Sequence, residues 1–352
     1  EPEIALGIYL VRSQASFRLG RVEEAIARQR DGLDLARTLK NRVEEGRSLT
    51  ALGLILLESR QPALAVEHME QAVEIAREVG DRVLESRALG NLANAAAYVL
   101  RDYISAREYY KQAQKLAVEL GDRFGEGVEK ANIGWVTMLL GDYETARAEL
   151  EGALSIAREV DHSYQEIYTL LNLSAVNEAQ GNVEPSEQYA VQAMELSLER
   201  GDRSGEAWSY YYLGNALLGS GKLDEARSAF ARALQMRAEQ NQPSLAKEPL
   251  AGLIRVALAD HDHALAIQYA NEVMEYLANG GTLDGAEEPL RIYLACFDAL
   301  KTKHDPRCDE ILAVARDLLN AQAARISVVS SRRRFIDNVP WRREIMEHVA
   351  KM

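Results

Sequence analysis

Aromatic residues, prolines and cysteines are scarce in this chain of 352 residues. Aromatic residues make up 7% of it and prolines number 8, against 47% hydrophobic residues, a profile typical of helical proteins rich in alanine and leucine. The two cysteines, Cys296 and Cys308, form neither a CxxC pair nor a disulfide framework. A reducing, cytoplasmic location is therefore the simplest interpretation.

Basic residues are also outnumbered: 41 Lys and Arg face 54 Asp and Glu, a formal net charge of −13. This charge repels a phosphate backbone, which argues against a nucleic-acid partner. No apolar run approaches the ~18 residues that a membrane span needs and no signal peptide opens the chain, so we expect no membrane partner. The start Glu1-Pro2-Glu3 runs directly into a helical pattern, from which we expect a fragment of a longer protein.

Sequence motifs for catalysis or cofactor binding are missing as well. There is no GxxxxGK(S/T) loop, no GxGxxG after a strand, no GxSxG and no HExxH. His261-Asp262-His263 is interpreted as a solvated turn, because zinc sites need three or four organised ligands and no third one lies nearby in sequence. Carboxylates fall at solvent-facing helical positions and in caps. We therefore predict no enzyme activity, no cofactor and no metal site.

A repeat of about 40 residues is present instead. One column of small residues recurs at spacings of 40, with a single spacing of 41. Its members are Ala25, Ala65, Ala106, Ala146, Ser186, Ala226 and Ala266. A second column follows seven residues later, at Gly32, Ala72, Ala113, Ala153, Ala193, Ala233 and Val273. Each unit shows apolar residues at three- and four-residue steps in two segments, which predicts seven pairs of amphipathic helices.

The links between the predicted helix pairs share a breaker, Gly-Asp-Arg, at residues 80–82, 121–123 and 201–203. Glycine is suited to end one helix and aspartate to cap the next. Two segments, Glu248-Pro249-Leu250 and Glu288-Pro289-Leu290, predict first helices that begin late or kink. The second of them opens an irregular eighth unit over residues 288–325.

The period and its small columns, with Gly53, Gly134 and Gly214 twelve residues before the first column, resemble the tetratricopeptide repeat over residues 4 to about 300. The resemblance implies an all-α, right-handed superhelix of about eight helix pairs, whose first helices line a concave groove. It also implies a protein or peptide partner. We expect a repeat array over 1–325 and a capping or docking segment over 326–352.

The C-terminal segment ends on the pattern Phe335…Val339-Pro340…Arg343-Glu344-Ile345. This ending resembles the last part of repeat arrays in bacterial STAND-type ATPases and cyclase-linked AAA regulators. This resemblance implies a sensor or scaffold arm of a larger signalling protein. The alternative is a self-association or autoinhibition domain that controls a linked ATPase or cyclase. Residues 322–352 carry seven basic and three acidic residues. We expect the arginines to stay solvated or to dock on the acidic array or a neighbouring domain, rather than on phosphate. Phe335, Val339 and Trp341 are expected to pack on the eighth unit.

Three asparagines, Asn91, Asn132 and Asn172, occupy the same place in successive first helices. In similar proteins this position points toward the groove, where an amide matches both the N–H and the C=O of a bound peptide. The alternative, that these amides bond a neighbouring helix and hold the repeats in register, stays equally open.

Further groove candidates fall on the first helices. Exposed aromatic side chains on a groove wall favour an interaction hot spot, although for any single one packing in the core is the favoured interpretation. The arginines can receive acidic ligand side chains or pair along their own helix. These candidates are Asn94, Asn215, Trp135, Tyr168, Trp208, Tyr211, Arg47 and Arg87.

Overall fold

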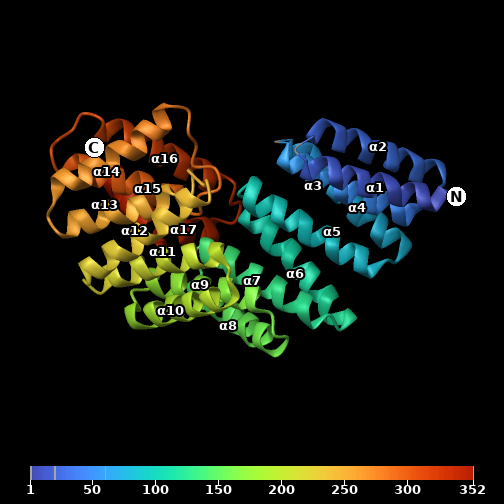
Figure 1. The fold of residues 1–352 in the computed structure, drawn as a ribbon, viewed down its shortest axis with the longest axis horizontal. Coiled ribbons are helices and arrows are strands. Elements are labelled where there is room, and N and C mark those ends of the chain that lie inside the picture. The colour runs from blue at the N-terminus through green and yellow to red at the C-terminus, as the bar shows by residue number, and fades with distance from the viewer. Residues whose placement is uncertain (1, 20, 60, 352) are drawn as a thin grey trace. The chain divides into compact units, whose positions relative to one another are not determined.

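The computed structural model describes residues 2–19, 21–59 and 61–351, and within these ranges every regular element is a helix. The chain divides into two compact units, Glu1–Val136 (unit 1) and Thr137–Met352 (unit 2). The predicted all-α fold, an α-solenoid built from helix pairs, is confirmed (Figure 1).

Unit 1 contains the first three helix pairs and most of a seventh long helix. These elements are α1 (Pro2–Arg18) with α2 (Val22–Thr38), α3 (Arg42–Glu58) with α4 (Pro62–Val79), α5 (Arg82–Asn94) with α6 (Tyr103–Leu120), and α7 (Arg123–Leu139).

Unit 2 begins within the last turn of α7 and continues with α8 (Tyr143–Glu159). Its further pairs are α9 (Ser163–Ala179) with α10 (Val183–Arg200), α11 (Arg203–Gly219) with α12 (Leu223–Glu239), α13 (Lys247–Ala259) with α14 (His263–Ala278), and α15 (Pro289–Lys301) with α16 (Cys308–Ala324). Two short helices, α17 (Val329–Asp337) and α18 (Pro340–Val349), form the C-terminal segment.

The small-residue columns lie where helices pack most closely. Every member of the first column, from Ala25 to Ala266, has no exposed surface. At the fifth unit both small positions are serines, and they satisfy each other: Ser174 Oγ donates to the Ser186 carbonyl at 2.9 Å, and Ser186 Oγ donates to the Ser174 carbonyl at 3.0 Å. A buried hydroxyl is tolerated when it is hydrogen-bonded, so the column continues without a gap.

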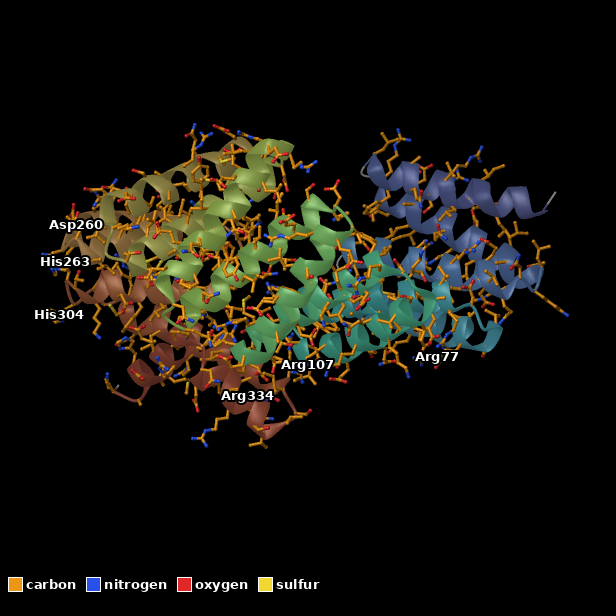
Figure 2. The ribbon with its side chains drawn as sticks, turned by 90° about the horizontal axis from the view of Figure 1, so that it is seen from below. Arg77, Arg107, Asp260, His263, His304 and Arg334 are labelled. Carbon is orange, nitrogen blue, oxygen red and sulfur yellow. The ribbon has the colours of Figure 1, made fainter. Side chains whose placement is uncertain are left out.

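The Gly-Asp-Arg breakers act as predicted. Gly80 ends α4 at φ 71°, and Asp81 caps α5 by accepting the backbone N–H of Leu84 at 2.9 Å. An ion pair also bridges the turn: Arg77 in the preceding helix, labelled in Figure 2, donates to Glu85 in the next helix at 2.8 Å. The same type of ion pair joins Arg37 to Glu45 and Arg158 to Glu166. At these three junctions the contact ties one helix pair to the next.

The single spacing of 41 residues has a local structural cause. After α5 the chain forms a π-helical turn over Ala95–Val99, and Arg101 then takes the left-handed conformation at φ 53°. A π-turn accommodates one extra residue in a helix without shifting the helices around it. The repeat therefore resumes in phase at Ala106.

The two proline-containing first helices begin late, as predicted. Both α13 and α15 have 13 residues, against 17 in α9 and α11. The start of α15 is capped from the previous repeat, because Glu248 Oε1 accepts the backbone N–H groups of Glu287 at 2.7 Å and Glu288 at 3.2 Å. Burial raises the pKa of Glu248 to about 8.

Among the described residues, no helix is both long and apolar enough to cross a membrane. Helix contacts in unit 2 run almost entirely between adjacent repeats, as is usual in a repeat array. A few contacts skip repeats: Arg291 on α15 pairs with Glu178 on α9, and the C-terminal segment contacts the residues that begin the unit.

Candidate functional site

A cavity of about 460 Å³ opens in unit 2 along the first helices of four successive repeats. Residues of α9, α11, α13 and α15 line it, and Pro340, Trp341 and Glu344 at the start of α18 close it on one side. We call this space the inner cavity. Its volume falls within the range of small-ligand sites, roughly 300–1,000 Å³.

An ion pair crosses the inner cavity. Arg291 on α15 makes two hydrogen bonds to the carboxylate of Glu178 on α9, one of them from Nη1 to Oε2 at 3.2 Å. Arg291 lies 4.9 Å above the Trp341 ring, so the tryptophan covers the pair. The guanidinium holds the pKa of Glu178 below its ordinary value, although burial acts in the opposite direction. The pair therefore stays charged inside the fold.

Next to this pair, among the described residues, lie a cation without a carboxylate partner, Arg255, and an amide donor without an acceptor, on Asn215. Arg255 Nη1 donates to Asn215 Oδ1 at 2.8 Å, and among the described residues Arg255 has no carboxylate within ion-pair distance. Asn215 is 1% exposed, and its Nδ2 is buried without a hydrogen-bond partner. Burial and the like charge of Arg291 lower the pKa of Arg255 to about 10, so it remains a cation near neutrality. A carboxylate or a peptide carbonyl is the chemistry that satisfies these donors.

The C-terminal segment is anchored by a buried arginine. Arg342 is 1% exposed; it donates to the Leu139 carbonyl at 2.7 Å and to Glu288 Oε1 at 2.7 Å. Its guanidinium also lies 4.0 Å from the Phe335 ring. Phe335 and Val339 are buried, while Trp341 is half-buried and donates from its ring N–H to Glu288 Oε2 at 3.1 Å.

The C-terminal segment also contacts the turn between α7 and α8. Arg334 donates to Asp142 at 2.6 Å, and Asn338 donates to the Gly141 carbonyl at 2.9 Å (Figure 2). Gly141 takes φ 76°, and a Cβ there would lie 2.6 Å from the Arg334 carbonyl oxygen, so only glycine fits. The expected docking of tail arginines on acidic side chains is present, at a place the repeat pattern does not indicate.

Asn91 and Asn132, which lie in unit 1, are both half-buried. Asn132 Nδ2 lies 3.5 Å from Glu129 Oε2 on its own helix, whereas Asn91 makes no side-chain hydrogen bond to a described residue. Asn172 in unit 2 is likewise half-buried and makes none. No bond that would hold repeats in register is therefore seen at these positions, and their role in ligand binding stays a prediction.

Glu129 is a residue that the sequence reasoning missed. Its Oε1 packs against Gly90 of α5, 3.1 Å from where a Cβ would stand. Burial raises the pKa of Glu129 to about 7. The carboxyl therefore adds a titrating group beside Asn132.

The other predicted binding residues of unit 1 differ in the exposure of their side chains. Asn94 is exposed, and its Oδ1 accepts the Tyr110 hydroxyl at 2.7 Å. Arg47 pairs along its own helix with Glu44 at 2.6 Å, while Arg87 is exposed. Trp135 is buried and stacks on Tyr98, with ring centroids 4.5 Å apart, so it packs in the core, the interpretation favoured for any single aromatic candidate.

In unit 2 the aromatic candidates form part of the packing. Tyr168 and Trp208 are half-buried; Tyr168 donates to Ser204 at 3.3 Å, and Trp208 lies 4.4 Å from the Arg237 guanidinium. Tyr211 is buried, and so is Asn215, because the helices on both sides cover α11. Tyr211 therefore packs in the core, as favoured for any single aromatic candidate, while Asn215 lines the inner cavity.

The charged residues of the inner cavity were also missed. Arg255 stands 40 residues after Asn215, in the same column of the repeat. That column was the available signal, since a polar residue at the same first-helix position should line the same surface. Glu178 and Arg291 come from repeats three apart and share no column, so no periodicity connects them.

Comparison with known proteins supports the repeat assignment. Residues 7–78 and 129–199 match one tetratricopeptide repeat model, and residues 207–238 match another. No curated protein matches the sequence.

Solved structures with a similar fold include the apo form of the quorum sensor NprR from B. thuringiensis, at TM-score 0.66 and 15% identity over 91% of this chain and 89% of that one. A Rap protein complexed with competence and sporulation factor matches at TM-score 0.60 and 14% identity, over 98% and 99%. A STAND-type signal-transduction ATPase with a repeat sensor, from Pyrococcus horikoshii, matches at 0.61 and 14%, over 90% of this chain and 44% of that one.

Proposed function

Because the chain belongs to the tetratricopeptide repeat family, we propose that it is a non-catalytic module that binds an extended peptide or protein segment along its first helices. The observation that carries the proposal is the amide donor of Asn215, which is buried in the inner cavity without an acceptor, beside Arg255, a cation that has no carboxylate partner among the described residues. A buried donor without an acceptor costs about 1–3 kcal/mol, which a bound carboxylate or carbonyl recovers. An acidic side chain or a C-terminal carboxylate of the ligand would meet Arg255.

The proposal assigns Asn91, Asn132 and Asn172 to the backbone of a bound segment, each within its own unit. Asn94, Arg47 and Arg87 add exposed polar contacts in unit 1. A row of spare amides suits an extended polypeptide, because its backbone groups are unpaired until it binds. Residues 1–325 act as the array and 326–352 as its cap and as one wall of the inner cavity.

We further propose that the module is a cytoplasmic sensor or scaffold arm of a larger signalling regulator. What supports this is the likeness to the Pyrococcus protein, which carries such a repeat sensor beside an ATPase and of which this chain covers 44%. The alternative is autoinhibition or self-association. The seating of α17 and α18 against the start of unit 2 favours the autoinhibitory form, in which the C-terminal segment competes with a ligand.

A pool of random octapeptides tests the proposal. The protein is mixed with the pool, and retained peptides are identified by mass spectrometry and measured by calorimetry. We expect selection of peptides with an acidic residue or a free C-terminal carboxylate, and loss of at least tenfold in affinity on Arg255→Ala. Arg316→Ala is the matched control, since Arg316 lies on a second helix and pairs with its neighbour Asp317. Equal binding by both variants would contradict the proposal.

Light scattering distinguishes a ligand sensor from a self-association domain. A monomer that binds selected peptides supports a ligand sensor, whereas a dimer that forms with rising concentration and binds no peptide supports self-association. Tighter peptide binding after removal of residues 326–352 would support autoinhibition.

A further inference from the structure

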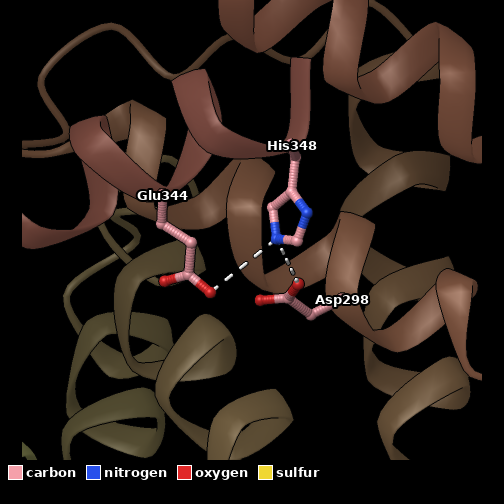
Figure 3. A group of neighbouring side chains, drawn as sticks. All are labelled: Asp298, Glu344 and His348. Carbon is pink, nitrogen blue, oxygen red and sulfur yellow. Dashed lines mark ion pairs between the residues drawn. The ribbon is translucent and has the colours of Figure 1, made fainter. Parts of the chain in front are cut away.

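Within the described residues, Asp298, Glu344 and His348 bring their ligand-type atoms within 4.8 Å of one another (Figure 3). Asp298 lies on α15, while Glu344 and His348 lie one turn apart on α18. His348 Nε2 is 3.8 Å from Asp298 Oδ1 and 3.8 Å from Glu344 Oε1. Figure 3 shows both carboxylates directed at this nitrogen atom.

The imidazole nitrogen that faces the carboxylates is unsatisfied. His348 Nε2 is buried and has no hydrogen-bond partner, because 3.8 Å is too long for a hydrogen bond. Burial lowers the pKa of His348, which disfavours the charged form of the ring. A buried nitrogen beside two carboxylate oxygens is an arrangement that a bound cation would satisfy.

We propose that Asp298, Glu344 and His348 form a binding site for a divalent transition-metal ion, such as Zn²⁺, that ties α18 to α15. One imidazole nitrogen and two carboxylate oxygens are a ligand set that zinc accepts, at roughly 2.0–2.2 Å from each. The three atoms need only small side-chain movements to reach those distances. A water molecule completes the coordination, and because Asp298 and Glu344 also line the inner cavity, the ion has a path from solvent.

Lys301 opposes the ion. Its Nζ lies 3.4 Å from His348 Nδ1, the second ring nitrogen, and its side chain is exposed. A metal-bound imidazole carries its proton on that second nitrogen, which cannot then accept from an ammonium group. The lysine must therefore swing into solvent when the metal binds. It follows that replacing Lys301 by an uncharged residue should strengthen binding.

The consequence is a metal-dependent anchor for the C-terminal segment. Two of the three ligands belong to α18, so the ion adds a cross-link beside the contacts of Arg342 and Phe335. This inference does not depend on peptide binding, since the site lies between two helices of the same unit and needs no other ligand.

The test is titration of the full chain with Zn²⁺ alone, by calorimetry and thermal melting. We expect one equivalent to bind and the melting temperature to rise with metal concentration. His348→Ala and Glu344→Gln should each weaken binding at least tenfold, and Lys301→Met should strengthen it several-fold. Circular dichroism verifies that the variants remain helical.

Two controls identify other zinc ligands. The double variant His261→Ala/His263→Ala removes the pair of histidines at the α13–α14 turn, where His261 is exposed. Cys308→Ser removes the half-buried thiol. Both should bind Zn²⁺ as the wild type does. Absence of binding, or binding that survives His348→Ala but is lost in a control, would overturn the assignment, as would weaker binding by Lys301→Met.

Discussion

Arg291 and Glu178 form a two-bond ion pair across unit 2 although they stand 113 residues apart in the sequence. They belong to α15 and α9, first helices separated by two intervening helix pairs. An ordinary repeat array buries surface only between neighbours. The pair, together with the seat of Arg342 on Leu139, adds contacts within unit 2 that bypass the repeat order.

The ion pair should be needed for the stability of unit 2. Arg291→Ala leaves a buried carboxylate without its cation, and we expect a loss of about 3 kcal/mol in the free energy of unfolding. Urea denaturation measures it. The double variant Arg291→Ala/Glu178→Gln should lose clearly less than the sum of the two single variants. Arg316→Ala, which removes an exposed pair with Asp317, should change stability by under about 0.5 kcal/mol. Additive losses in the double variant would speak against a direct interaction.

Gly141→Ala should detach the C-terminal segment. The new Cβ would lie 2.6 Å from the Arg334 carbonyl oxygen, on backbone that cannot easily shift. Gly181→Ala is a matched control, since Gly181 has nearly the same φ, 77°, with nothing within 4 Å of the added atom. Both substitutions carry the left-handed penalty of roughly 1–2 kcal/mol. Only Gly141→Ala should also accelerate tryptic cleavage after Arg333 and Arg334. Equal cleavage in the two variants would contradict the packing of the C-terminal segment against the α7–α8 turn.

Removing Asn91 or Asn132 should leave stability nearly intact. Neither amide bonds a neighbouring repeat, so we expect Asn→Ala at either position to cost under about 0.5 kcal/mol. Peptide affinity should fall by about 0.5–1.5 kcal/mol, the net worth of a neutral hydrogen bond. Thermal melting beside calorimetry with a selected octapeptide measures both. Loss of stability with unchanged affinity would favour the register role.

Glu129 should make unit 1 less stable at alkaline pH. Its pKa in the folded state is about 7, above the ordinary 4.5, so the folded chain holds the proton more tightly than the unfolded chain does. This contribution is full below pH 4.5 and is lost as the pH rises toward 7. Glu129→Gln should therefore stabilise the protein by about 1–3 kcal/mol at pH 8 and by almost nothing at pH 4. Urea denaturation of the wild type and the variant at both pH values measures this difference in the free energy of unfolding. If the difference were the same at pH 4 and pH 8, titration of Glu129 could not be its cause.

The amino-acid sequence determined the repeat by itself. Three signals act over a few neighbouring residues: the small-residue columns, the Gly-Asp-Arg breakers and the prolines of the two Glu-Pro-Leu segments. They therefore fix helix ends and nearest-neighbour packing locally. The one-residue insertion before Ala106 was also legible, and the π-turn absorbs it. Asn215 was singled out from its first-helix position, although its burial depends on the helices beside it.

Only the tertiary structure decided which distant residues meet. Glu178 and Arg291, Asp142 and Arg334, and the group Asp298, Glu344 and His348 come together because successive helix pairs rotate and the C-terminal segment folds back. That rotation is the sum of many small packing angles, and no periodicity records where the sum brings two repeats into contact. The sequence therefore determined the elements and their neighbours, while the inner cavity depends on the curvature of unit 2.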